Sequence, residues 1–319
     1  MPLSSSSRRR RGGRGGRRGR NAPTAPAAAD ETETRNWAEL PLDAISAILH
    51  KLDHVDILMG AGQLCRSWRG AARDEPELWR RINMLGYADL EHELNFPGMA
   101  QAAVRRSAGR CEAFWCEYAA DHDFLLYLAD QAPSLKSLRL ISCYDVFDDG
   151  LTEAIMKFPL LEELELSVCP NVDDSGVFGV ISKACPQLKR FRLCKDVFFD
   201  YEARLTAILD NCRHLESLDI RHCFNVTMDD ALRAKCARIS TLRLPNDSTD
   251  DYDFIVKSPI WRNSESFLGD YVGSDSDYEL GSDDYDDYCD PSRYLDGVYE
   301  DELNDEARML LRGMRMLMK

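Results

Sequence analysis

Apolar residues in the middle of the chain repeat the spacing L-x-x-L-x-L at intervals of 24 to 27 residues. The copies are Leu135, Leu138 and Leu140; Leu161, Leu164 and Leu166; Leu188, Phe191 and Leu193; Leu215, Leu218 and Ile220; and Ile239, Leu242 and Leu244. A degenerate copy, Cys111, Phe114 and Cys116, precedes them. A repeat of this length is typical of solenoids that stack one short strand per unit. We therefore predict a repeat solenoid of about six units over residues 111–246.

Helical patterns separate these strand patterns. They are GLTEAIMKF from Gly150, SGVFGVISKA from Ser175, YEARLTAIL from Tyr201 and DDALRAKCA from Asp229. Each unit is therefore expected to be a parallel strand on the inside followed by a helix on the outside. Residues 83–110, before the first copy, are expected to form a helical linker or cap.

Residues 36–82 show helical spacing instead of the strand template. A first helix is expected to begin at Leu40 and Pro41, because proline is favoured in a first helical turn. A second and a third short helix follow, and the third ends before Pro76. The apolar residues of the three are Leu42, Ile45, Ile48, Leu49 and Leu52; Val55, Ile57 and Leu58; and Leu64, Cys65, Trp68, Ala71 and Ala72. Because the module is small, it cannot bury all of these apolar side chains. Some of them are therefore expected to face another domain or another protein.

Charge is distributed unevenly along the 319 residues, whose net charge is −15. Residues 1–29 hold eight arginines and no acid, so the remaining residues carry −15 − 8, or −23. This asymmetry indicates two tails around a folded middle. No apolar run is long enough to span a bilayer, and none follows the basic stretch to make a secretory signal. The eleven cysteines, an odd number, are expected to be mostly buried thiols in a reducing compartment.

The basic tail, residues 1–35, has too few apolar side chains to fold and is expected to be disordered. Four roles remain open for its run SSSSRRRRGGRGGRRGR, from Ser4 to Arg20. It is typical of a nuclear-import patch, but Arg-Gly segments also contact RNA backbone. An organelle transit peptide is less well supported because no amphipathic pattern accompanies the arginines. A solubilising tail without a specific partner is the fourth alternative.

The other tail is acidic. Residues 247–300 lack a helix or strand period and are expected to be disordered, with Ser274, Ser276 and Ser282 as candidate phosphorylation sites among acids. Residues 301–319 return to helical spacing, with acids first and bases last, as the helix dipole favours. This predicted amphipathic helix either packs back on the domain or binds a partner.

Residues 36–82 resemble an F-box. The resemblance rests on the LP start at Leu40, the I-x-x-I-L helix, the D-I-L segment, the C-R-S-W helix and the later E-P-x-L-W. It implies binding to the Skp-type adaptor of cullin-based ubiquitin ligases. By position, the implied adaptor-binding residues are Leu40, Pro41, Ile45, Ile48, Leu58, Cys65, Trp68 and Trp79. Trp68 has an equally good alternative as an internal core residue.

The repeats resemble the cysteine-containing class of leucine-rich repeat. A cysteine follows the last apolar strand residue by three positions in three units, at Cys143, Cys169 and Cys223. An F-box followed by such repeats resembles the plant F-box/LRR proteins over about residues 36–244. The resemblance implies a three-helix module, then a short α/β solenoid, with disordered tails. Six units are too few for the closed horseshoe that holds small molecules in long relatives, so no cofactor is expected.

One residue between the inward positions of each strand faces the other side of the sheet. Read along the stack, these residues are Trp115, Arg139, Glu165, Arg192, Asp219 and Arg243, and Glu163 and Arg190 extend the alternation of charge on the adjacent column. Neighbouring strands lie about 4.8 Å apart, so opposite charges become neighbours. Two interpretations stand: a ladder of exposed pairs worth about 0.2–1 kcal/mol each, or a concave face that binds a protein substrate.

The stretch CRHLESLDIRHC contains Cys212, His214, His222 and Cys223. It does not predict a metal site, because Cys223 occupies the same repeat position as Cys143 and Cys169. No catalytic residues are expected either. The resemblance therefore implies a non-catalytic substrate receptor of an SCF-type ubiquitin ligase, nuclear or cytoplasmic. Its partners would be a Skp-type adaptor, through it a cullin, and a protein substrate. A non-ligase scaffold, or an RNA-associated protein acting through the arginine tail, is the alternative.

Overall fold

The computed structural model describes residues 37–91, 93–172, 175–195, 202–254 and 256. The predicted basic tail, the acidic tail beyond residue 256 and the predicted helix 301–319 lie outside the described residues. None of the described helices is long and apolar enough to cross a membrane.

Three short helices form the N-terminal module, as predicted. They are α1 (Leu42–Leu49), α2 (His54–Met59) and α3 (Arg66–Asp74), with 3-10 helices at Trp37–Glu39, Ala61–Gln63 and Pro76–Trp79. Pro41 caps α1 with φ −56°, the value that its ring imposes, so the helix begins where the sequence places it.

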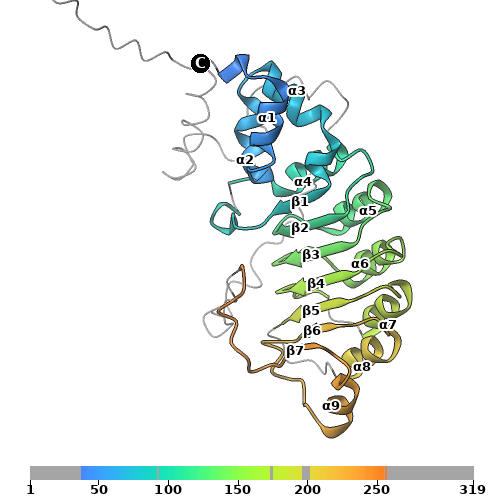
Figure 1. Cartoon of the computed structure of the whole chain (residues 1–319). Helices are drawn as coiled ribbons and strands as arrows, with labels where there is room; N and C mark the ends of the chain where they lie inside the picture. Colours follow the sequence, from blue (N-terminus) through green and yellow to red (C-terminus); the bar gives the residue numbers. More distant parts are fainter. Residues whose placement is uncertain (1–36, 92, 173–174, 196–201, 255, 257–319) are drawn as a thin grey trace, which may run out of the picture. The chain divides into compact units, whose positions relative to one another are not determined.

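Seven parallel strands follow in sequence order and form one sheet (Figure 1). They are β1 (Arg81–Met84), β2 (Ala113–Glu117), β3 (Ser137–Ile141), β4 (Glu163–Ser167), β5 (Arg190–Cys194), β6 (Ser217–Asp219) and β7 (Thr241–Arg243). Helices connect the strands and cover one face of the sheet: α4 (Phe96–Arg106), α5 (His122–Gln131), α6 (Asp148–Ile155), α7 (Ser175–Ala184), α8 (Glu202–Asn211) and α9 (Asp230–Cys236). The predicted fold class, a helical module followed by an α/β solenoid, is confirmed.

Strand β1 is one more strand than the sequence analysis expects. Trp79, Ile82 and Met84 fit the L-x-x-L-x-L template and are fully buried, and β1 pairs with β2 so that Asn83 faces Trp115. This copy of the repeat template was not predicted because Trp79 is also the last residue of the F-box pattern. Trp79 therefore belongs to both the F-box and the first repeat. The segment 83–110, expected to be only a helical linker, therefore contains the end of β1 as well as α4.

The helical module and the sheet share one hydrophobic core. A single cluster of buried side chains extends from Ile45 in α1 to Ile239 before β7. At the junction, Trp79 donates its indole N–H to the carbonyl of Ala72 at 2.6 Å, and His54 of α2 packs against its ring at 5.2 Å between centroids. His54 Nδ1 accepts the backbone N–H of Asn83 while Nε2 lies 3.0 Å from the carbonyl of Leu78. These contacts attach α2 directly to the first strand.

The turn after each of four strands has the same backbone conformation. One residue per turn has a positive φ, and its N–H donates to a carbonyl of the next unit at 2.7 to 3.1 Å. These residues are Tyr118 (φ 61°), Ser142 (50°), Val168 (56°) and His222 (68°). His222 stands directly before Cys223, just as Ser142 stands directly before Cys143. His222 and Cys223 are therefore part of the repeat turn. No group of three or more potential metal ligands occurs among the described residues.

Candidate functional site

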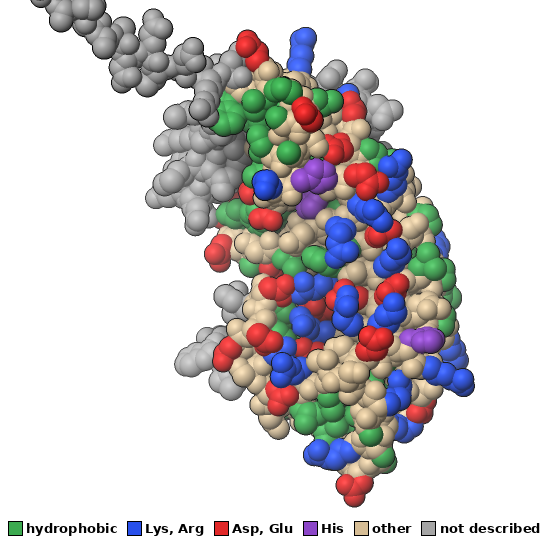
Figure 2. Space-filling model, viewed as in Figure 1, with side chains coloured by type: hydrophobic (Ala, Val, Ile, Leu, Met, Phe, Trp, Pro, Cys, Tyr) green, Lys and Arg blue, Asp and Glu red, His purple; other side chains and the backbone are tan. Residues whose placement is uncertain are grey.

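The six predicted face residues form one row across the sheet. The strand register pairs Trp115 with Arg139, Arg139 with Glu165, Glu165 with Arg192, Arg192 with Asp219 and Asp219 with Arg243. Figure 2 shows acidic and basic side chains interleaved over these strands. The predicted juxtaposition is therefore confirmed, whereas a binding role for the row stays a prediction.

The carboxylates of the row are buried beneath arginines. Glu165 accepts from Arg139 Nε at 2.6 Å and from Arg192 Nη1 at 3.2 Å, and only 4% of its side chain is exposed. Arg192 also donates through Nε to Asp219 at 3.1 Å. The row is thus a partly desolvated network, unlike the ladder of exposed pairs that the sequence allows. In such a network an unpaired charge costs far more than at the surface.

Arg221, which was not predicted from the sequence, completes the network. It lies two positions after Asp219, so both side chains emerge on the same face. Its Nε and Nη2 donate to the two oxygens of Asp219 at 3.0 and 2.7 Å, and only 3% of its side chain is exposed. Burial favours the neutral form of Asp219, yet hydrogen bonds and charge from Arg221 and Arg192 hold the pKa of Asp219 below its ordinary value. The spacing of two residues between Asp219 and Arg221 is the feature of the sequence that could have predicted this contact.

A second row lies beside the first, as predicted from Glu163 and Arg190. Arg190 donates to Glu163 at 3.0 Å, and Ser137 Oγ donates to the same carboxylate at 2.8 Å. Trp115 donates its indole N–H to Ser137 Oγ at 2.8 Å, and its ring lies between the guanidinium groups of Arg81 and Arg139 at 5.1 and 5.6 Å. Trp115 therefore closes the charged face at the end nearest β1.

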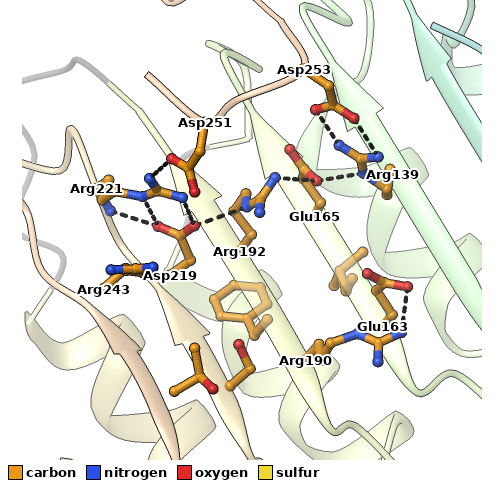
Figure 3. Close-up of a pocket in the computed structure, with 14 residues that line it drawn as sticks. Arg139, Glu163, Glu165, Arg190, Arg192, Asp219, Arg221, Arg243, Asp251 and Asp253 are labelled. Atoms are coloured by element: carbon orange, nitrogen blue, oxygen red, sulfur yellow. Dashed lines mark hydrogen bonds and ion pairs between the residues drawn. The ribbon is translucent and has the colours of Figure 1, made fainter. Parts of the chain in front are cut away.

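The two rows line a pocket of about 390 Å³ (Figure 3). Its charged residues from the sheet are Arg139, Arg190, Arg192, Arg221 and Arg243 against Glu163, Glu165 and Asp219. We call this surface the arginine face. Its five arginines exceed its three carboxylates by two, although the whole chain carries −15.

A segment after β7 crosses the arginine face on the side away from the helices (Figure 1). We call residues 249–254 the strap. Arg139 donates to both oxygens of Asp253 at 2.9 and 2.7 Å, and Arg221 donates to Asp251. Between them, Tyr252 donates its hydroxyl to Asp219 at 3.2 Å. The prediction of a disordered tail over residues 247–300 is wrong for the strap, which lies against the sheet because its carboxylates meet arginines far away in sequence.

The implied adaptor-binding residues divide into two groups. Ile45, Leu58, Trp68 and Trp79 are buried within the chain, and Trp68 donates to the carbonyl of Trp37. Leu40, Ile48 and Cys65 are partly buried and Pro41 is exposed. The first group packs inside the module and the second reaches the surface, and adaptor binding by these residues stays a prediction.

A groove runs between α1 and α3 of the module. It is lined by Leu40, Leu42, Asp43, Ile45, Ser46, Arg66, Ser67, Gly70, Ala71, Asp74 and Glu75. Leu42 is 65% exposed and the neighbouring Trp37 56% exposed, and Figure 2 shows hydrophobic side chains gathered over α1. Leu42 was placed on the predicted apolar helix face but was not among the implied adaptor contacts. Its exposure singles it out.

Comparison with known proteins identifies the family. The F-box-like family model matches residues 37–85. F-box protein SKIP19 of Arabidopsis thaliana is 37% identical over 291 residues, covering 83% of this chain and 92% of that protein. Two further proteins of the same plant are similar: putative F-box/LRR-repeat protein 22, at 33% over 80% of this chain and 90% of its own length, and putative F-box/LRR-repeat protein 23, at 35% over 69% and 56%. The chain therefore belongs to the plant F-box/LRR-repeat proteins.

Proposed function

We propose that this chain is the non-catalytic substrate-recognition subunit of a cullin-based SCF ubiquitin ligase. The F-box module binds a Skp-type adaptor, and the arginine face binds a protein target. The observation that carries the proposal is the pairing, in one chain, of a matched F-box with an exposed apolar groove and a charged sheet face built from repeats. Exposed apolar patches and repeat surfaces are both typical of protein interfaces.

Adaptor binding is assigned to the exposed edge of the groove. Leu40, Pro41 and Leu42 form a turn and a first helical residue that no described part of the chain covers fully. Burying such side chains in a partner removes apolar surface from water without disturbing the module's own core. The acids Asp43, Asp74 and Glu75 and the base Arg66 at the rim supply polar contacts that set orientation.

Ubiquitin transfer itself is assigned to other subunits. A receptor that holds a target near the ubiquitin donor accelerates transfer by proximity alone. Proximity can lower the activation free energy by many kcal/mol, because binding has already brought the reacting groups together. This role requires two separate interfaces on one rigid body. The shared core between α2, Trp79 and β1 supports that requirement, because it couples the module to the sheet without a flexible linker.

The experiment is capture of the full chain by a purified Skp-type adaptor. We expect the substitution of Leu40→Ala with Pro41→Ala, and separately Leu42→Asp, to abolish capture. Leu160→Asp is the matched control, since Leu160 is also an exposed leucine but lies in the repeats, before β4. Undiminished capture of both F-box variants would overturn the proposal. Capture without ubiquitination of any bound target in a reconstituted ligase would favour the scaffold alternative.

A further inference from the structure

We infer that the arginine face is a receptor for an acidic peptide segment in which a tyrosine stands between two carboxylates, and that strap residues 251–253 occupy this receptor in competition with such a segment. The inference deepens the proposed function, on which it rests for the statement that the peptide belongs to a target protein. The strap itself shows what chemistry the face accepts.

Each strap residue meets a group suited to it. The Asp253 carboxylate forms a bidentate pair with the Arg139 guanidinium, a geometry that selects planar carboxylates. The Tyr252 ring lies under two guanidinium groups, of Arg221 at 4.2 Å and Arg192 at 4.9 Å. Two cations near one ring both gain from cation–π attraction, and the hydrogen bond from the Tyr252 hydroxyl to Asp219 fixes the position of the ring. Aspartate, tyrosine and aspartate are thus recognised in order.

The charge of the face favours the same class of ligand. Without the strap, the arginine face has two more arginines than carboxylates, and Asp251 and Asp253 bring the pocket to neutrality. Arginines held in a partly enclosed pocket attract anions more strongly than they would in open water. Arg243 is exposed and forms none of the ion pairs in Figure 3, so it is positioned to meet a ligand longer than the strap.

The strap is held loosely enough to be displaced. Half or more of the side chains of Asp251 and Asp253 is exposed, and no strap residue is fully buried. Ion pairs with one exposed partner contribute little individually, because water screens their attraction. The strap nevertheless competes well because it belongs to the same chain, where the effective concentration of a short tether reaches about the millimolar range. A target segment must therefore bind more tightly than the strap or arrive already tethered.

The same order of residues recurs further along the chain. Asp277-Tyr278-Glu279 and Asp284-Tyr285-Asp286 each place a tyrosine between two acids, in the part of the chain beyond the described residues. Asp200-Tyr201-Glu202 has the same order of residues. The test is therefore made in a full-length background carrying Tyr201→Ala, Tyr278→Ala and Tyr285→Ala, which leaves the strap as the one acid–tyrosine–acid segment of the sequence.

The experiment measures binding of a fluorescent peptide, STDDYDF, the sequence of residues 248–254, to the full chain. Three protein variants are compared with the background. The first, Asp251→Asn with Tyr252→Ala and Asp253→Asn, frees the face, so the peptide should bind at least about tenfold more tightly. Arg139→Lys, added to it, keeps the charge beside Glu165 but loses the bidentate fork, and should weaken binding several-fold. Arg243→Gln, added to it instead, changes an exposed residue and should weaken binding less.

Peptide variants keep the test independent of protein folding. The peptide STNNYNF lacks the carboxylates and STDDADF lacks the ring, and neither should bind the freed face. Equal binding of STNNYNF and STDDYDF, or equal affinity of the background and the freed face for STDDYDF, would overturn the inference. Adaptor capture is measured on the same samples. Loss of capture with peptide binding intact would sink the proposed function alone, and the reverse result would sink this inference alone.

Discussion

Arg139 and Asp253 lie 114 residues apart in the chain and form a bidentate ion pair with distances of 2.9 and 2.7 Å. The same guanidinium donates through Nε to Glu165, so Arg139 joins the buried network of the sheet to the strap. The two carboxylates differ in their surroundings. Glu165 is almost fully buried, whereas half of the Asp253 side chain is exposed. The contact on the strap side is therefore the weaker and more reversible of the two.

Removing the carboxylate of Asp253 should release the strap without unfolding the sheet. In Asp253→Asn the charge on Arg139 keeps Glu165 as a partner, so we expect a loss of at most about 1 kcal/mol in the free energy of unfolding. Backbone amides of residues 249–254 should exchange with deuterium several-fold faster, while those of β3 and β4 keep their protection. Hydrogen exchange read by mass spectrometry measures both.

Asp250→Asn is the matched control, since Asp250 lies in the same strap but forms no ion pair among the described residues. Acid offers an independent check. Burial is the largest single influence and raises the pKa of Asp253, but hydrogen bonds and charge attraction, mainly from Arg139, together outweigh it and lower the pKa from the ordinary value of 3.8. Docking is then complete above about pH 4 and is lost as the pH falls through the lowered value. Strap exchange that stays slow in Asp253→Asn at neutral pH would show that the pair does not hold the strap.

Glu165→Gln should destabilise the chain far more than the same change at Glu163. The Glu165 side chain is 4% exposed between two arginines, and an amide leaves both cations without a charge partner at that position. Breaking a buried pair from one side costs on the order of 3 kcal/mol. Glu163 is 23% exposed and, within the part of the chain that the structure describes, forms one ion pair, with Arg190, so the loss of its charge should cost about 1 kcal/mol or less. Urea unfolding of both variants measures the difference, and equal midpoints would contradict this account.

The repeat period alone predicted most of the fold. Six strands, their register and the alignment of Trp115, Arg139, Glu165, Arg192, Asp219 and Arg243 follow from one template, because alternation along a strand and equal spacing between units leave little freedom. Strand β1 was not predicted because Trp79 fits both the F-box motif and the L-x-x-L-x-L template. A template applied without first assigning Trp79 to the F-box would have found it.

The strap could not be found from periodicity. Residues 249–254 have neither a strand nor a helix period, and their contacts to Arg139 and Arg221 depend on three-dimensional closure across many residues. Charge counting alone gave a disordered acidic tail, because it does not say which arginines remain uncompensated on the folded sheet. For the F-box, the family motif located the module, but burial was needed to separate the core residues Trp68 and Trp79 from the exposed Leu42.

His54 should make stability depend on pH. Burial dominates and lowers the pKa of His54 from its ordinary value of 6.5, because the ring is enclosed between α2 and β1. As the pH falls below 6.5, the unfolded chain takes up the proton before the folded chain does. The free energy of unfolding should therefore decrease between about pH 7.5 and about pH 5.5. Thermal melts of His54→Gln should show a smaller decrease than the wild type, and the exposed His214→Gln should behave like the wild type. Parallel curves for His54→Gln and the wild type would contradict the assignment.

Val168→Asn should stabilise the repeats, although it replaces an apolar side chain with a polar one. Val168 has φ 56° in the turn after β4, a conformation that β-branched residues rarely adopt and that asparagine tolerates. Its N–H donates to the carbonyl of Cys194 at 2.7 Å, and the substitution keeps this bond. We expect a gain of about 1 kcal/mol in the free energy of unfolding, measured by urea titration. The matched control is Val180→Asn, at a similarly half-buried valine in α7, where asparagine has about the same helix propensity and relieves no backbone strain, so no stabilisation is expected. Destabilisation at both positions would mean that the half-buried methyl groups of Val168 outweigh the backbone strain of the turn.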